Sequence, residues 1–234
     1  MLDPLYLLLM LPAFALSLWA SFRTRSAFNK YSKVGTMNGY TGAQAARVLL
    51  ERAGIRDVEV VRTGGYLSDH YNPVNKRLAL SEAVHDSRSI AAVGVACHEA
   101  GHAIQHARSY KPLWLRSALV PTANIGSKLG YFAMLGGLIL LYMGTALGVQ
   151  VVIFGAILFS AVLLFQIVTL PVEFDASNRA KRLAVEYGVV AAQERQGMDR
   201  VLNAAAMTYV AAAVSTLMTL LYFLIRAGVL GGRR

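Results

Sequence analysis

Four long segments that contain no charged side chain constrain the fold of this chain more than any other feature. They cover residues 4–22, 129–150, 151–170 and 201–225. A helix of about 20 apolar residues can cross the hydrocarbon core of a bilayer. A short uncharged turn rich in glycine, near residues 144–148, joins the second and third segments and predicts a transmembrane hairpin within residues 128–170. The sequence therefore predicts a mostly α-helical, polytopic membrane protein with about four transmembrane helices.

Composition and charge support a membrane protein. The chain is 56% hydrophobic and only 15% charged, which is more apolar than an ordinary soluble domain. Its net charge is +10, and 14 of its basic residues lie in residues 23–117. Cytoplasmic loops of membrane proteins carry such an excess of Lys and Arg. We therefore expect the lipid bilayer and not nucleic acid as a partner, and a multi-pass position in the cell (inner) membrane. Residues 23–117 and 171–200 would be cytoplasmic, with both termini outside.

A metal-binding motif lies in the first polar segment. Residues 98–102 read H-E-x-x-H, and two histidines four residues apart lie on one face of a helix with about 5–6 Å between their Cβ atoms. A helix is expected because Ser87 or Ser89 can cap its start and no proline occurs before Pro112. His98 and His102 could then share one Zn2+ ion. Glu99 would project beside them, toward a water on that metal.

A third zinc ligand has to come from elsewhere, because a catalytic zinc usually takes three protein ligands. His106 is in phase with the two histidines, but in a continuous helix it lies about 12 Å along the axis from His98, so we reject it as a ligand. Glu173 and Asp175 follow the predicted hairpin, where the chain returns to the cytoplasmic side. We predict Glu173 as the third ligand. Asp175 as the ligand, or a solvated role for both acids, are the alternatives.

The rest of the polar sequence predicts a small α+β domain around this helix. Residues 41–54 form an amphipathic pattern with Thr41 as its cap, and strand-like runs follow at 58–61 and 77–81. A separate helix is expected over 176–187, after the hairpin. An edge of the sheet could pair with an extended peptide, or a plain hairpin could simply cover the metal helix. His70 and Tyr71 could donate to a developing oxyanion, or be ordinary polar turn residues.

Three motifs together resemble a known family. They are residues 65–73 (GYLSDHYNP), 95–107 (VACHEAGHAIQHA) and 170–177 (LPVEFDAS). The chain resembles the YugP-like neutral zinc metallopeptidases, membrane relatives of the HtpX and CAAX-prenyl-type peptidases. This resemblance implies a gluzincin-like site with zinc bound by His98, His102 and Glu173, and with Glu99 as the base. In better-known relatives an Asp four residues after the ligand Glu orients a histidine. Here that position is Ser177. Asp175 could take the place of the missing aspartate, and Arg179 is a further candidate to support the ligands or an oxyanion.

These features predict a membrane-embedded zinc metalloendopeptidase, a hydrolase that cleaves peptide bonds at the cytoplasmic membrane face. The expected substrate is a peptide or a membrane protein, in membrane-protein processing or quality control. The alternative is a zinc-containing membrane scaffold or chaperone-like protein without turnover. An intact Glu99 argues against this alternative. The sequence leaves homo-oligomerisation open.

Overall fold

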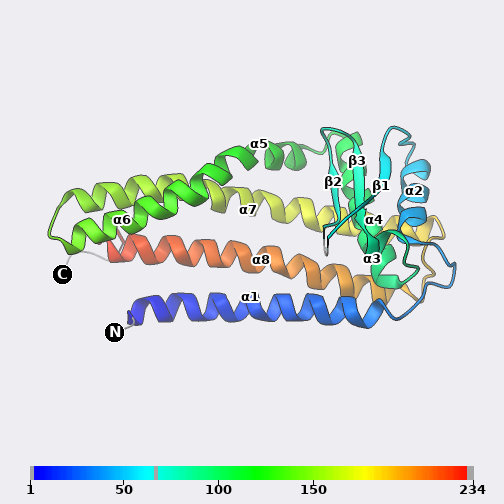
Figure 1. Ribbon diagram of the computed structural model, residues 1–234, viewed down its shortest axis with the longest axis horizontal. Coiled ribbons are helices and arrows are strands. Elements are labelled where there is room, and N and C mark those ends of the chain that lie inside the picture. Colours follow the sequence, from blue (N-terminus) through cyan, green and yellow to red (C-terminus); the bar gives the residue numbers. More distant parts are fainter. Residues whose placement is uncertain (1–2, 66–67, 231–234) are drawn as a thin grey trace. The chain divides into compact units, whose positions relative to one another are not determined.

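The computed structural model describes residues 3–65 and 68–230, so Tyr66 and Leu67 of the first family motif lie outside the described residues. The described chain is mostly helical with a small sheet, as predicted, and this sheet has three strands (Figure 1). In chain order the elements are α1 (Pro4–Tyr31), α2 (Gly42–Arg52), β1 (Glu59–Thr63), β2 (His70–Asn72), β3 (Arg77–Ser81), α3 (Glu82–His85), α4 (Ile90–Ala107), α5 (Lys111–Ile125), the π-helical turn η1 (Gly126–Gly130), α6 (Tyr131–Tyr142), α7 (Leu147–Glu186) and α8 (Arg195–Arg226).

The described residues divide into two compact units. Unit 1 contains residues 3–19, 115–170 and 209–230, and unit 2 contains residues 20–114 and 171–208. Helices α1, α5, α7 and α8 contribute residues to both units. Four helical stretches are long and apolar enough to cross a membrane: Pro4–Tyr31, Lys111–Tyr142, Leu147–Glu186 and Arg195–Arg226. Their number agrees with the predicted four spans. The charge-free segments 4–22, 151–170 and 201–225 each lie within one of these stretches, whereas segment 129–150 extends past Tyr142 into the start of α7.

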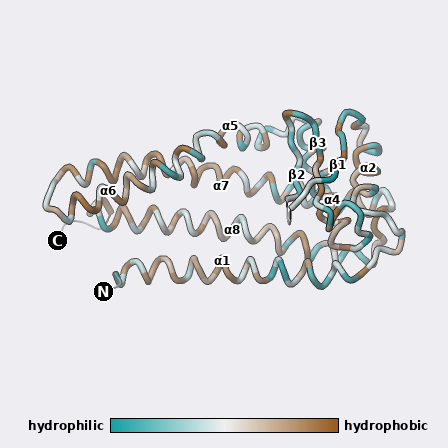
Figure 2. Tube along the Cα trace, viewed as in Figure 1, coloured by the Kyte–Doolittle hydropathy of each residue, from teal (hydrophilic) through white to brown (hydrophobic). Residues whose placement is uncertain are grey.

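Unit 1 is built from apolar helices that pack closely. Buried side chains from α6, α7 and α8 form its core, among them Met134, Val152 and Phe223. Helices α6 and α7 approach so closely that a Cβ on Gly137 would lie 2.7 Å from the backbone nitrogen of Val152. Large apolar side chains remain exposed on the outer faces, and Figure 2 shows hydrophobic residues along these helices. Exposed apolar surface of this kind suits contact with lipid.

Unit 2 has a core of its own around α4. Ser89 caps the start of α4, where its hydroxyl accepts a hydrogen bond from the Ala92 N–H at 3.2 Å, as the sequence predicted. Thr41 caps α2 through a capping box with Gln44, which also agrees with the prediction. The inner faces of α2 and α4 pack against parts of α7 and α8. The largest apolar contributors include Leu49, Val93, Ile104, Met198 and Leu202.

Two local expectations are corrected by the structure. The two predicted strands, β1 and β3, pair in parallel and do not form a hairpin, and β2 pairs antiparallel on the other side of β3, giving the order β1-β3-β2. His70 and Tyr71 therefore belong to a strand, which is too short to show a pattern in the sequence. The expected separate helix over 176–187 is instead the end of α7, which continues through Pro171. Helices that cross membranes tolerate proline in this way.

Candidate metal centre

Three side chains from two helices converge in unit 2. His98 and His102 come from consecutive turns of α4, and Glu173 comes from α7. One ligand atom from each lies within 4.8 Å of the others. The Glu173 Oε2 atom is 3.2 Å from His98 Nε2 and 3.6 Å from His102 Nε2. The Glu173 residue is only 1% exposed. The structure thus brings together the three residues predicted as ligands, although Glu173 lies more than seventy residues after the two histidines.

A glycine on α4 allows the two helices to meet. A Cβ atom at Gly101 would lie 2.6 Å from the backbone oxygen of Ala176, which is closer than real Cβ contacts. At Gly94 a Cβ would meet only the Cγ atom of the Met198 side chain, at 3.3 Å. The backbones of α4 and α7 therefore touch where Gly101 meets Ala176. Gly101 directly precedes His102, and Ala176 lies three residues after Glu173. This contact sets the distance between the ligands.

Hydrogen bonds to the other ring nitrogens orient both histidines. The Nδ1 atom of His98 lies 3.0 Å from the hydroxyl of Ser177, and the Nδ1 atom of His102 lies 3.0 Å from Gln105 Oε1. Ser177 therefore contacts a histidine from the position where better-known relatives have aspartate. Since Nδ1 is engaged in each ring, Nε2 is the atom turned toward Glu173. Metal-binding histidines are usually fixed in this way.

Gln105 is the residue that sequence reasoning missed. Its amide nitrogen donates to the carbonyl of Val172 and to Asp175 Oδ2, both at 2.8 Å, which leaves its amide oxygen to accept from His102. The tautomer of His102 follows from this arrangement, because only Nδ1–H can donate to that oxygen. One feature of the sequence indicated this role: Gln105 lies three residues after His102 and therefore on the same side of α4.

Asp175 supports the site without joining the ligand cluster found among the described residues. Besides accepting from Gln105, its carboxylate accepts from Arg179 Nε at 2.6 Å. The guanidinium of Arg179 lies over the ring of Tyr110, 5.7 Å from its centre. Asp175 thus acts on His102 through Gln105. The alternative prediction named Asp175 as the third ligand, but its carboxylate is not part of the cluster of ligand atoms among the described residues.

The charges of the three clustered groups depend on one another. Burial raises the pKa of Glu173, but hydrogen bonds with His102 and His98 outweigh burial and hold this pKa well below its ordinary range. Burial lowers the pKa of His102, and the hydrogen bond and charge of Glu173 more than reverse that effect and raise it. Glu173 is therefore an ionised carboxylate that faces two imidazoles. A metal cation would replace the protons that the imidazoles share with it.

This donor set fits a zinc ion. Two imidazole nitrogens with engaged Nδ1 atoms and one carboxylate oxygen are ligands that zinc takes in catalytic sites, where a fourth position stays open for water. Glu99 lies on α4 directly after His98 and is buried, with 8% of its surface exposed. A carboxylate so close to the cluster is suited to exchanging protons at a metal-bound substrate or water.

The remaining candidates lie apart from the ligand atoms. His106 forms a hydrogen bond of 2.8 Å through Nδ1 with the hydroxyl of Tyr71, and it is not part of the cluster found among the described residues. That His106 is not a metal ligand stays a prediction. His70 is exposed, and its Nδ1 lies 2.8 Å from the Ser68 carbonyl. An oxyanion role for Tyr71 or His70 stays a prediction.

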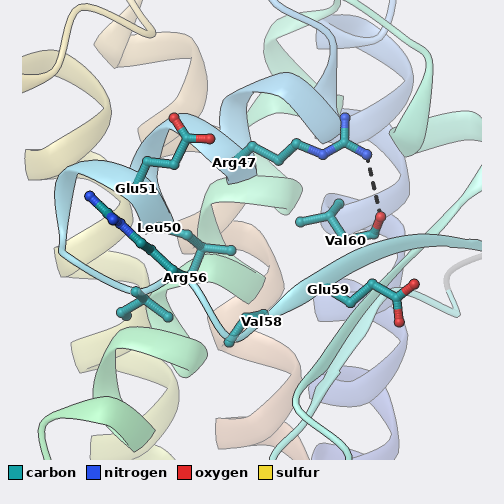
Figure 3. Close-up of a pocket in the computed structure, with 8 residues that line it drawn as sticks. Arg47, Leu50, Glu51, Arg56, Val58, Glu59 and Val60 are labelled. Atoms are coloured by element: carbon teal, nitrogen blue, oxygen red, sulfur yellow. Dashed lines mark hydrogen bonds between the residues drawn. The ribbon is translucent and has the colours of Figure 1, made fainter.

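One free edge of the sheet is partly covered. The Glu59 N–H donates toward β3, to the Lys76 carbonyl, so strand alternation turns the Val60 carbonyl to the outer edge of β1. There Arg47 of α2 donates to it at 3.3 Å, as Figure 3 shows. A cavity of about 640 Å³ lies between α2 and β1 at this edge, with Leu50 in its wall. A peptide that paired with β1 would have to displace Arg47, as expected of a protected edge strand.

Comparison with known proteins identifies the family. Residues 6–228 match the profile of a family described as "Putative neutral zinc metallopeptidase". The chain belongs to this family. A similar protein from Bacillus subtilis (strain 168), named "Putative membrane protease YugP", is 46% identical over 219 residues, which cover 94% of this chain and 95% of that protein. No solved structure matches the chain.

Membership of the neutral zinc metallopeptidases confirms the resemblance predicted from the three motifs. It also confirms the predicted class of enzyme, a zinc metallopeptidase. The four candidate spans and the similarity to a protein named as a membrane protease support a membrane location. For a zinc metallopeptidase, the His98, His102 and Glu173 cluster is the place in the described structure where a metal ion could be held.

Proposed function

We propose that this protein is a membrane-embedded zinc endopeptidase in which His98, His102 and Glu173 hold the metal and Glu99 is the general base. One observation carries the proposal. Three ligand atoms of the types that zinc takes lie within 4.8 Å of one another, and they belong to the residues that the H-E-x-x-H motif and the family resemblance had indicated.

Each residue has a defined task in the proposed reaction. When bound, zinc lowers the pKa of water and polarises the carbonyl of the scissile peptide bond. Glu99 accepts the proton of the attacking water and later delivers it to the leaving amine. Ser177 and Gln105 hold the two imidazoles in the orientation that directs Nε2 to the metal. Asp175 holds Gln105 in turn, and Arg179 holds Asp175.

We further propose that the site faces the cytoplasm, with both termini outside the cell membrane. The basis is the excess of basic residues in residues 23–117, which the positive-inside rule places in the cytoplasm. A peptidase site that follows directly on membrane-spanning helices meets the cytoplasmic segments of other membrane proteins. Such segments, or damaged membrane proteins, are the substrates we propose, in processing or quality control.

Two variants test the proposal. Glu99→Gln keeps the size of the side chain but removes the base, so it should lower cleavage of casein or of a membrane-protein substrate by at least about 100-fold while the zinc content stays unchanged. Glu173→Ala should lose the zinc itself, as measured by metal analysis of the purified protein. Cleavage that survives Glu99→Gln would show that the assignment of the base is wrong. A wild-type protein that binds zinc and cleaves nothing would favour the alternative, a scaffold without turnover.

A further inference from the structure

A cavity of about 370 Å³ opens beside the C-terminal half of α4. Its wall combines Ala103, His106 and Ala107 of α4 with Tyr71 of β2 and Trp114 of α5. Asp57 and Lys76 also line it. All of these residues belong to unit 2. We refer to this cavity as the His106 pocket. It has no part in the metal centre described above.

The His106 pocket continues the face of α4 that carries the proposed catalytic groups. Residues four apart on a helix lie on the same face. Ala103 and Ala107 therefore follow Glu99 along one row, and His106 follows His98 and His102 along the neighbouring row. Four residues advance a helix by about 6 Å. The pocket thus begins about 6 Å past the proposed base and the second ligand, in the direction of the C-terminal end of α4.

Three aromatic rings in the wall offer a surface on which an aromatic or aliphatic side chain can pack. The rings of Trp114 and Tyr71 lie 5.7 Å and 5.8 Å from the His106 ring, measured between centroids. The hydroxyl of Tyr71 and the Nδ1 atom of His106 satisfy each other through their 2.8 Å hydrogen bond. The charges of Asp57 and Lys76 neutralise each other, with 2.5 Å between Oδ2 and Nζ. These contacts leave the exposed ring of Trp114 and the exposed Ala107 as apolar surface for a ligand, beside polar surface to which Ser109 contributes.

Trp114 adds an independent reason to expect a ligand. The residue is 57% exposed, although tryptophan is usually largely buried. Exposed tryptophan beside a cavity is typical of binding surfaces, where it provides a large apolar contact area at low entropy cost.

We propose that the His106 pocket is a substrate subsite that holds an aromatic or long aliphatic side chain of the peptide. This inference rests on the proposed function. An extended peptide advances about 3.3 Å per residue, so a displacement of about 6 Å corresponds to two residues. The pocket therefore selects the side chain within two residues of the scissile bond, and it determines which sequences the enzyme cleaves.

Filling the pocket tests the proposal through cleavage specificity. Ala107 is exposed at the last turn of α4, so Ala107→Phe can place a ring in the pocket without disturbing the core. A peptide library analysed by mass spectrometry should show that the wild type prefers Phe, Trp, Leu or Met at one position near the cut. Ala107→Phe should shift this preference to Gly, Ala or Ser and lower kcat/KM for the large residues at least tenfold. Ala192→Phe, at an exposed alanine outside the pocket, is the matched control and should leave the preference unchanged.

A binding measurement tests the pocket without turnover. The chain has two tryptophans, so Trp19→Phe leaves Trp114 as the only one. In a protein that also carries Glu99→Gln, a peptide with Phe at the preferred position should change the Trp114 fluorescence to saturation. The same peptide with Gly at that position should not.

The outcomes separate this inference from the proposed function. A wild type without cleavage would overturn the proposed function and the subsite with it. Cleavage whose preference is the same in the wild type and Ala107→Phe would overturn the subsite alone. A cleaved Phe peptide that leaves Trp114 fluorescence unchanged would also overturn the subsite alone. Zinc content equal to that of the wild type in Ala107→Phe shows that the metal centre is intact, so a changed preference then supports the subsite.

Discussion

Gln105 offers the sharpest test of how the metal centre is held. Its side chain is completely buried and forms three hydrogen bonds, to His102, Val172 and Asp175. Gln105→Leu preserves the approximate volume and removes all three. The Nδ1–H of His102 then has no acceptor in a buried site, and its tautomer is no longer fixed.

The size of the effect follows from these contacts. Removing a residue that orients a metal-binding histidine typically lowers metal affinity by about 10–100-fold. This corresponds to about 1.4–2.8 kcal/mol, at 1.4 kcal/mol for each tenfold change. The lost partners should also lower the free energy of unfolding of the metal-free protein by about 1–3 kcal/mol. Zinc affinity is measured by competition with a chromophoric chelator in detergent, and stability by unfolding of the metal-free protein. Gln193→Leu, at an exposed glutamine, is the control.

An exchange of side chains separates orientation from simple loss of packing. Gln105→Glu alone places a carboxylate 2.8 Å from that of Asp175, where an N–H donor now lies, and should weaken zinc binding. Adding Asp175→Asn restores a donor between the two positions and leaves an oxygen to accept from His102. The double variant should therefore bind zinc more tightly than Gln105→Glu alone. If Gln105→Leu binds zinc within about twofold of the wild type, the account of how His102 is oriented is refuted.

Two further predictions concern the helix contact and the aromatic pair. Gly101→Ala should cost about 1–3 kcal/mol of stability and weaken zinc binding, because its Cβ would lie 2.6 Å from the Ala176 oxygen. Gly94→Ala, which meets only the Met198 side chain, should be near neutral in unfolding experiments. Equal losses of stability in Gly101→Ala and Gly94→Ala would contradict a close backbone contact specific to Gly101. Burial and the charge of Asp57 raise the pKa of Tyr71 from 10.0 to about 12. A raised folded-state pKa contributes stability below pH 10 that is lost as the pH rises toward 12. The phenolate absorbance of the wild type minus that of Tyr71→Phe should show this ionisation with a midpoint near pH 12. A midpoint near pH 10 would contradict the raised pKa of Tyr71.

The sequence alone determined the features that depend on neighbouring residues. Four apolar segments identified the long helices, because their length and lack of charge are properties of each segment by itself. The cap at Ser89 and the spacing of His98 and His102 placed two ligands on one face of a helix, because helix geometry is local. The prediction of Glu173 as their partner relied on topology and on the family resemblance.

The tertiary structure decided what local pattern cannot contain. Gln105 met its partners Val172 and Asp175 only once α7 had packed against α4 at Gly101, because hydrogen bonds between helices depend on their approach and not on either sequence pattern. The parallel pairing of β1 with β3 could not be predicted either, since a strand pattern does not specify its partner or direction. The meeting of Tyr71, His106 and Trp114 joins three separate elements, and only packing brings such residues together.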